Sequence, residues 1–471
     1  MSTIAHRRRA GGLVGLRPLI GHGNALPQAP RAMNQTSSAL LDARLDQLRQ
    51  YETKKLYPRL VLFEALAAFK HKHKERQHSG DHVCDARRDF LDSFAYLCDT
   101  RKGGSTVTAA ALQKLPASDF LWLAANEGIS DDVFNYAKWL VRRLQTVTNE
   151  NKVEVQSSIF SQAVAKSRER VQFYKDMVQP LARNCRMQLR DKERDEIVIL
   201  LRKKLKALSE PDRKVTMEGY IDVCFVMRDA QVGHIKKFSS HPDDDFAKLA
   251  HYVWRMGATR SAANTVVDSM RTVPSLYQIT EIRLVSASQV EQKILDPTCI
   301  FPHEILHGIV TEAASRQPLE IHNAFTRLLE LDAPVERPIF NKIAAKTNVI
   351  TRVHAELQIV DTFSRHRWAF VADDKYIGCS KPACYFCYNW LVEHHYEYVA
   401  PKTHHKIIPG CRGPDGSLNE AGAKKILQMY HNIGKQIGQD ILEFLGQGGE
   451  LRRQYMSTQA PSTAVSSAGY V

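Results

Sequence analysis

The sequence predicts a mostly α-helical domain followed by a smaller α/β domain, in which helices pack on a mixed sheet. Two observations predict this order. Apolar residues recur at helical spacing through residues 42–314, and after residue 315 short apolar, β-rich stretches alternate with helical ones. The composition agrees, because 44% hydrophobic and 25% charged residues are typical of a globular protein and exclude a disordered or collagen-like chain.

The amino-terminal segment, residues 1–41, differs in composition from the rest of the chain. It contains five arginines and no acidic residue. Such a segment is typical of a mitochondrial presequence, while Arg7-Arg8-Arg9 also fits a nuclear-import cluster and a disordered tail fits equally. We expect an intracellular, cytoplasmic protein if the segment is no targeting signal, and a mitochondrial or nuclear one if it is.

The helical domain, residues 42–314, is predicted from spacing alone. Leu60, Phe63 and Ala67, for example, fall on one face of a helix. No apolar run approaches the roughly 20 residues that cross a bilayer, so we expect no membrane contact. The sequence of this domain indicates no chemistry.

One motif in this region suggests a minor alternative function. His303-Glu304-Ile305-Leu306-His307 fits H-E-x-x-H, the zinc metallopeptidase pattern, with Glu304 as the base. Pro302 directly before it predicts that a helix begins there, so the motif would not lie in a helix interior. A third ligand would have to come from a residue such as Glu312 or Glu330.

The α/β domain, residues 315–446, is predicted element by element. A helix with an apolar face ends before Pro334 and Pro338. Strands are expected at 349–350, 368–371 and 376–377, and helices at 353–364, 383–394 and 420–445. The last helix has a capping box, Ser417-x-x-Glu420, and should stop at Gly446. Residues 447–471 are rich in Gly, Ser and Thr and are expected to form a disordered tail.

The candidate chemistry lies at the starts of two of these helices. His354-Ala355-Glu356 opens one, and Cys384 and Cys387, three residues apart, share a face of the next. One imidazole and two thiolates leave a fourth tetrahedral position for water, which is the composition of a catalytic Zn²⁺ site. Zinc lowers the pKa of such a water to about 7, and Glu356 is close enough in sequence to act as proton shuttle without being a ligand.

This combination resembles a known family. H-x-E, then about 30 residues, then C-x-x-C preceded by a proline is the signature of the zinc-dependent cytidine-deaminase-like superfamily. The stretch Ile377-Gly378-Cys379-Ser380-Lys381-Pro382-Ala383-Cys384-Tyr385-Phe386-Cys387 looks more narrowly like a branch found in many fungal proteins and related to predicted bacterial toxin deaminases. One departure is that Ala383 separates Pro382 from the first cysteine.

The resemblance implies a fold and an activity for residues 315–446. The fold would be a sheet of about five strands with zinc between two helix starts. The metal ligands would be His354, Cys384 and Cys387, Glu356 would be the acid/base, and the reaction would be hydrolytic deamination of a nucleobase, free or in nucleic acid. The net charge of +14 favours a nucleic-acid substrate or partner slightly.

Two non-enzymatic alternatives stay open. Cys379, Cys384 and Cys387, completed by Cys411, His404 or His405, could close a structural zinc site that has no open position. An inactive deaminase fold could also serve as a zinc-stabilised interaction module. The residues that we assign to the substrate side, on weak grounds, are polar side chains near the motifs: Asn341, Asn348, Ser380 and His405.

Overall fold

The computed structural model describes residues 31–66, 74–190, 196–230, 232–241, 244–312, 318–333, 335–394, 397–414 and 419–446. The predicted tail at 447–471 and Ser417 of the capping box lie outside the described residues, and so do residues 1–30. Helix α1 (Arg31–Tyr51) begins inside the segment 1–41 that was expected to be a targeting or disordered segment.

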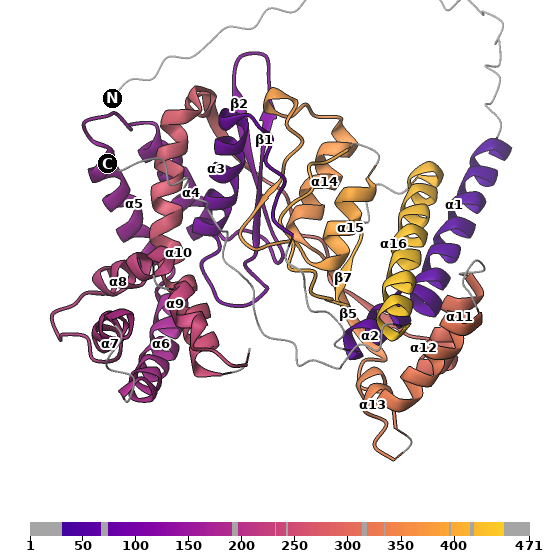
Figure 1. The fold of residues 1–471 in the computed structure, drawn as a ribbon. Coiled ribbons are helices and arrows are strands. Elements are labelled where there is room, and N and C mark those ends of the chain that lie inside the picture. The colour runs from indigo at the N-terminus through magenta and orange to yellow at the C-terminus, as the bar shows by residue number, and fades with distance from the viewer. Residues whose placement is uncertain are drawn as a thin grey trace, which may run out of the picture.

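A mixed four-stranded sheet forms the middle of the molecule, with strand order β3-β2-β1-β6 (Figure 1). Strands β1 (Thr108–Lys114) and β2 (Asp119–Ala125) form an antiparallel hairpin, which the ion pair between Lys114 and Asp119 (3.1 Å) closes. Strand β3 (Ile279–Leu284) runs parallel to β2, and the short β6 (Gly378–Cys379) runs antiparallel to β1.

The hairpin is buried on both faces. Its side chains point alternately to the two faces, and they therefore contribute to two separate apolar cores. On β1, Ala110 and Leu112 belong to one core, while Ala109 and Ala111 belong to the other. The first core holds α3 (His82–Cys98) and α10 (Asp245–Thr272). The second holds α14 (Ala355–His366) and α15 (Tyr385–Glu393). The sheet therefore separates two helical layers.

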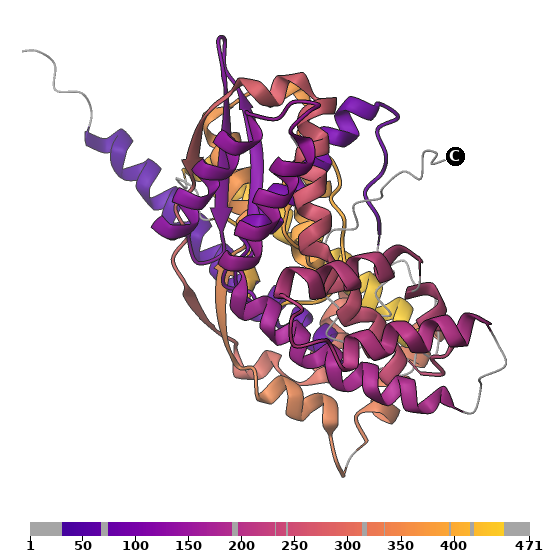
Figure 2. The ribbon, with the colours of Figure 1, turned by 90° about the vertical axis from the view of Figure 1, so that its left-hand side faces the viewer.

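The remaining helices of the first layer begin beside the strands, and the later, magenta ones extend beyond the lower ends of the strands as a lobe (Figure 2). Local signals start these helices, since Ser130 caps the helix that follows it and Asp244 caps α10 through its side chain. The helices are α4 (Asp131–Leu144), α5 (Lys152–Lys166), α6 (Arg168–Gln188), α7 (Glu196–Ser209), α8 (Met217–Ala230) and α9 (Val232–Lys237).

The second layer continues into a group of helices around α16, on the right of Figure 1. Helix α16 (Glu420–Gly446) packs against α1 and α12, and it matches the helix expected at 420–445. The other members of the group are η1 (Glu52–Leu56), α2 (Tyr57–Ala65), α11 (Pro302–Glu312), α12 (Pro318–Leu331) and α13 (Pro338–Ala344).

A second, three-stranded sheet lies beside this group, in the order β4-β5-β7. Strand β5 (Asn348–Val353) pairs antiparallel with β4 (Glu291–Ile294) and parallel with the two-residue β7 (Cys411–Arg412). The strand expected at 368–371 is wrong, because Phe370 makes only an isolated bridge and a 3₁₀ turn follows at Val371–Asp373. The strand expected at 376–377 lies slightly later, as β6.

These elements confirm the predicted fold class, a mostly helical region followed by an α/β part with a mixed sheet and packed helices. The arrangement is more interleaved than expected, however. Strands β1 to β4 lie within residues 42–314, and they complete both sheets of the carboxy-terminal part. Instead of one sheet of about five strands, the described residues form one sheet of four and one of three.

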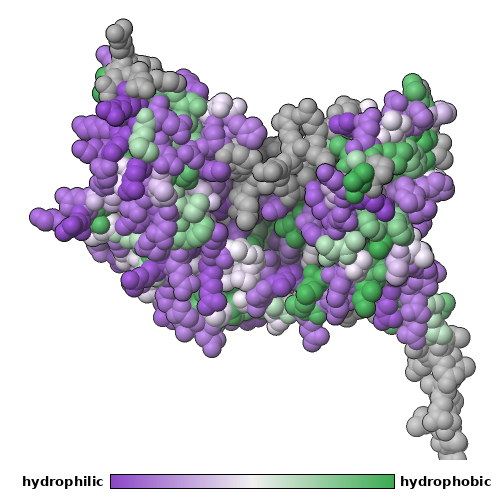
Figure 3. Space-filling view, turned by 90° about the horizontal axis from the view of Figure 1, so that it is seen from below, coloured by the Kyte–Doolittle hydropathy of each residue, from purple (hydrophilic) through white to green (hydrophobic). Residues whose placement is uncertain are grey.

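The surface differs between the two sides of the molecule. Seen from below in Figure 3, the side that carries α6 and α7 is mostly hydrophilic, and hydrophobic residues are more frequent on the opposite side. Leu319, Leu329 and Val335 are exposed there. Among the described residues no helix combines the length and the apolar character that a membrane span requires.

Candidate metal centre

The metal-ligand candidates lie at the beginnings of α14 and α15. His354 is the N-cap residue of α14, but its side chain does not cap the helix, so the ring is available for other contacts. Cys384 is the N-cap residue of α15, and its Sγ accepts a hydrogen bond from Cys387 N–H (3.5 Å). Both side chains therefore lie where helix dipoles favour negative charge, which suits a thiolate.

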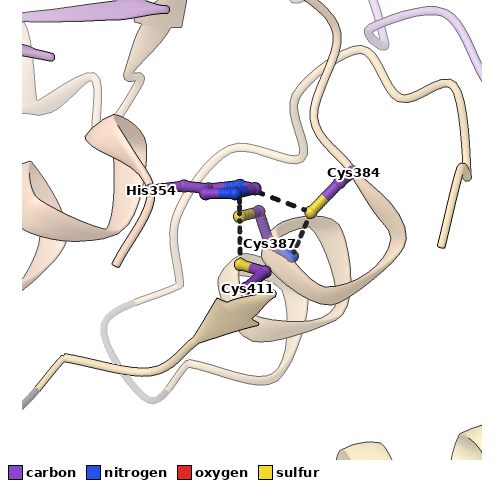
Figure 4. Close-up of side chains that lie close together, drawn as sticks. All are labelled: His354, Cys384, Cys387 and Cys411. Carbon is purple, nitrogen blue, oxygen red and sulfur yellow. Dashed lines mark hydrogen bonds between the residues drawn. The ribbon is translucent and has the colours of Figure 1, made fainter. Parts of the chain in front are cut away.

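These residues meet in one compact group, which a third cysteine joins (Figure 4). His354 Nδ1 lies 3.6 Å from Cys384 Sγ and 3.4 Å from Cys387 Sγ, and Cys387 Sγ lies 3.4 Å from Cys411 Sγ. All four donor atoms lie within 4.8 Å of one another. Three sulfurs and one imidazole nitrogen at these separations could hold a metal ion.

Glu356 lies beside this group, in the first turn of α14. Its side chain is only 4% exposed. Its Oε2 atom is buried and has no hydrogen-bond partner among the described residues. A buried carboxylate oxygen without a hydrogen-bond partner costs free energy, so the Oε2 atom of Glu356 does not stabilise the fold through a hydrogen bond.

The electrostatics of the group favour metal binding. Burial opposes ionisation of Cys384, but hydrogen bonds from Cys387 and Cys411 outweigh it and hold the pKa of this thiol well below its usual value. Burial also disfavours the charged form of His354, but the Cys384 thiolate raises the imidazole pKa overall. Burial raises the pKa of Glu356, Cys387 and Cys411. Without metal, the group therefore favours the thiolate form of Cys384, and a bound cation would displace the remaining protons.

The start of α14 is held by residues that the sequence analysis did not single out. Asn126, directly after β2, accepts a hydrogen bond from Ala355 N–H (2.8 Å) and donates to the carbonyl oxygen of Gly104 (2.8 Å). Gln358 donates to the carbonyl oxygen of Val353 (2.9 Å). Residues 127–354 separate Asn126 from the helix that it holds, so no local motif could reveal it.

Two of the residues assigned to the substrate side are Asn348, in β5, and Ser380, directly after β6. Asn348 is exposed at the first position of β5, opposite Ile294. The Ser380 hydroxyl is buried, where it donates to Asp99 (3.0 Å) and accepts from Thr108 N–H (3.1 Å).

The other two substrate-side candidates are His405, which contacts α15, and Asn341 of α13. His405 packs against the rings of Tyr388 (5.2 Å) and Tyr385 (6.1 Å). Asn341 is exposed and donates to the carbonyl oxygen of Glu336 (2.8 Å).

The structure also places several residues of the alternative zinc sites, namely the closed structural site and the H-E-x-x-H motif. Cys379 and His404 lie outside the group of four, and His404 Nδ1 accepts a hydrogen bond from Lys406 N–H (2.9 Å). The H-E-x-x-H motif lies in the first turns of α11, as Pro302 predicted, with His303 and Glu304 both 55% exposed. Among the described residues no third ligand accompanies it.

Comparison with known proteins agrees with this geometry. Residues 353–415 match the model of a family described as OTT_1508-like deaminases. The matched segment contains all four donors and Glu356. No curated protein and no solved structure matches the chain. Sequence match and donor geometry together show that this part of the chain is a domain of the deaminase superfamily.

Proposed function

We propose that the protein is a zinc-dependent hydrolase that removes the amino group of a nucleobase. The single observation that carries the proposal is the buried, unpartnered Oε2 atom of Glu356 beside three or four metal donors. A structural zinc site has no use for such a carboxylate, whereas deamination needs a proton carrier. The chemistry of the donors fits zinc, since it is bound by thiolate and imidazole.

The residues would divide the work as follows. His354 Nδ1 and the thiolates of Cys384 and Cys387 would hold the ion. Zinc lowers the pKa of water and so supplies hydroxide at neutral pH. Glu356 would take the proton that the water loses and deliver it to the ring nitrogen. Glu356 would then take the proton of the hydroxyl group that has added to the carbon and deliver it to the amino group, so that a carbonyl forms as the carbon–nitrogen bond breaks and ammonia leaves.

The test is Glu356→Gln, which keeps the shape of the side chain and removes its proton transfer. We expect zinc content to stay at the wild-type level while kcat/KM for deamination falls about 10²- to 10⁴-fold. Ammonia release from cytosine- and adenine-type nucleosides, nucleotides and single-stranded oligonucleotides measures the activity. Glu304→Gln is the matched control, because Glu304 is an exposed glutamate early in α11 that lies outside the donor group.

The control also tests the peptidase alternative. If the protein cleaved a peptide substrate, and Glu304→Gln lost this cleavage while Glu356→Gln kept it, the deaminase assignment would be wrong and α11 would carry the chemistry. If the wild type released no ammonia and cleaved no peptide, a non-enzymatic zinc-stabilised module would be favoured. The observation in favour of that second candidate is the fourth donor, Cys411, which completes a closed set of ligands.

Nucleic acid is the partner class that we propose from charge. The net charge of +14 is spread along the chain, and phosphate contacts make binding dependent on salt. We expect single-stranded DNA or RNA to bind more weakly at 200 mM than at 50 mM salt, by tenfold or more if several phosphates are contacted. If binding does not change between the two salt concentrations, nucleic acid is not the partner, and free nucleosides or nucleotides remain as the candidate substrates.

A further inference from the structure

Three of the six distances between the four donor atoms are close to those of a filled tetrahedral site, and all four atoms lie within 4.8 Å of one another. With metal–sulfur distances of about 2.3 Å and metal–nitrogen distances of about 2.0 Å, the edges of a tetrahedron are about 3.8 Å between sulfurs and about 3.6 Å between sulfur and nitrogen. The observed separations of 3.4 to 3.6 Å lie within half an ångström of these edges. Cys411 therefore stands where a metal would otherwise carry water.

The four donors are not equivalent in how the fold presents them. His354, Cys384 and Cys387 are fixed by the starts of α14 and α15, two helices that pack in the core. Cys411 comes from β7, a strand of two residues at the edge of the small sheet. Withdrawal of β7 would remove Cys411 by breaking the pairing with β5, while the other three donors stay on the two helices.

We propose that Cys411 is a displaceable fourth ligand, so that the metal centre rests in a closed form and admits water only when β7 withdraws. This inference rests on the proposed deaminase function and specifies how that site is regulated. The exchange involves no oxidation or reduction: water takes the position that the sulfur leaves, and the sulfur takes up a proton. The burial of the group supports a closed resting form, since Cys387 and Cys411 are fully buried and Cys384 is 3% exposed.

The structure also shows what holds β7 in place. Arg412, 1% exposed, donates to the carbonyl oxygen of Gln289 (2.7 Å) and lies 3.3 Å from Glu291. Gly413 N–H donates to Tyr430 OH (3.0 Å). A Cβ atom at Gly413 would lie 2.5 Å from the Trp390 ring, so the segment fits closely against α15 and α16. These contacts lie outside the metal ligands and determine how readily β7 can leave.

The experiment counts sulfur ligands and asks whether the metal has an open position. X-ray absorption of the full-length zinc protein gives the number of sulfurs, and azide added to the cobalt-substituted protein shifts its visible spectrum if a position is open. We expect three sulfurs and no azide shift in the wild type. Cys411→Ala should keep one metal per chain, with two sulfurs, and should bind azide. Cys379→Ala is the matched control, because it removes a neighbouring thiol outside the group and should behave as wild type.

Activity is measured in parallel so that the two proposals can fail separately. If the closed form predominates by ten to one, Cys411→Ala should deaminate about tenfold faster than wild type. If the wild-type metal is bound by three sulfurs but no variant deaminates a substrate, Cys411 is a ligand and the proposed deaminase function is wrong. Two sulfurs in the wild type, or an azide shift equal to that of Cys411→Ala, would overturn the closed form even if deamination is found. The wild-type measurements alone decide this point should Cys411→Ala not fold.

Discussion

Gly378→Ala tests a close contact between the amino-terminal and carboxy-terminal parts of the fold. Gly378 lies on β6, and the backbone of α3 passes directly over it. A Cβ atom at this position would lie 2.5 Å from Leu91 Cβ and 2.6 Å from Asp92 N. Overpacked cores lose about 1–3 kcal/mol. We expect about 3 kcal/mol here, because a backbone atom of a buried helix cannot turn aside as a flexible side chain does.

The assay is urea unfolding followed by tryptophan fluorescence, with zinc release measured in the same titration. Gly308→Ala in α11 is the control, since its added Cβ would meet no atom within 4 Å and alanine stabilises a helix interior by about 0.5–1 kcal/mol relative to glycine. Gly378→Ala should therefore shift the midpoint down and Gly308→Ala slightly up. A change of less than about 0.5 kcal/mol for Gly378→Ala would mean that α3 does not pack on β6 and would refute the interleaved fold.

Three further predictions concern charge and metal. Arg88→Ala should lower the free energy of unfolding by about 3 kcal/mol, because it leaves the buried Asp374 carboxylate, now 2.8 Å from Arg88, with a weaker partner. Arg49→Ala, which breaks an exposed ion pair, should lower it by less than about 0.5 kcal/mol in the same unfolding assay. Burial, with help from a nearby arginine, lowers the pKa of His251 to about 3. In the unfolded chain the same imidazole binds its proton near pH 6.5, so the free energy of unfolding should fall by about 2 kcal/mol between pH 7 and pH 5. His251→Phe should remove that loss. Equal acid sensitivity of the wild type and the variant would contradict the buried neutral imidazole. Chelation should lower the melting temperature of the wild type but not that of His354→Ala, if zinc is held at this group.

Much of the candidate site was predictable because its ligands are local in sequence. H-x-E and C-x-x-C each lie within one helical turn, and a spacing of three residues fixes a shared face whatever the rest of the chain does. Cys411 was only one of three residues considered to close a structural site. It reaches the group through the pairing of β7 with β5, a contact that no local spacing encodes.

The hairpin β1–β2 could not be predicted for a different reason. Residues 108–114 read Thr-Ala-Ala-Ala-Leu-Gln-Lys, in which only threonine is β-branched. Six of the seven residues are buried, so the polar alternation that marks a half-buried strand is missing. Alanine is a strong helix former, and the stretch was therefore included in the helical domain. Burial between two helical layers, rather than intrinsic propensity, makes it a strand.

The position of this hairpin also has a consequence during synthesis. Strand β1 pairs on one side with β2, its neighbour in sequence, and on the other side with β6, which follows only after residues 126–377. At about 5–20 residues per second, roughly 250 residues take about 13–50 s to translate. For that time the nascent chain carries a formed hairpin whose second edge has no partner from its own sheet. An unpaired edge is a template for pairing with other chains, so yield should depend on how fast the carboxy-terminal part arrives or on what shields β1 until then.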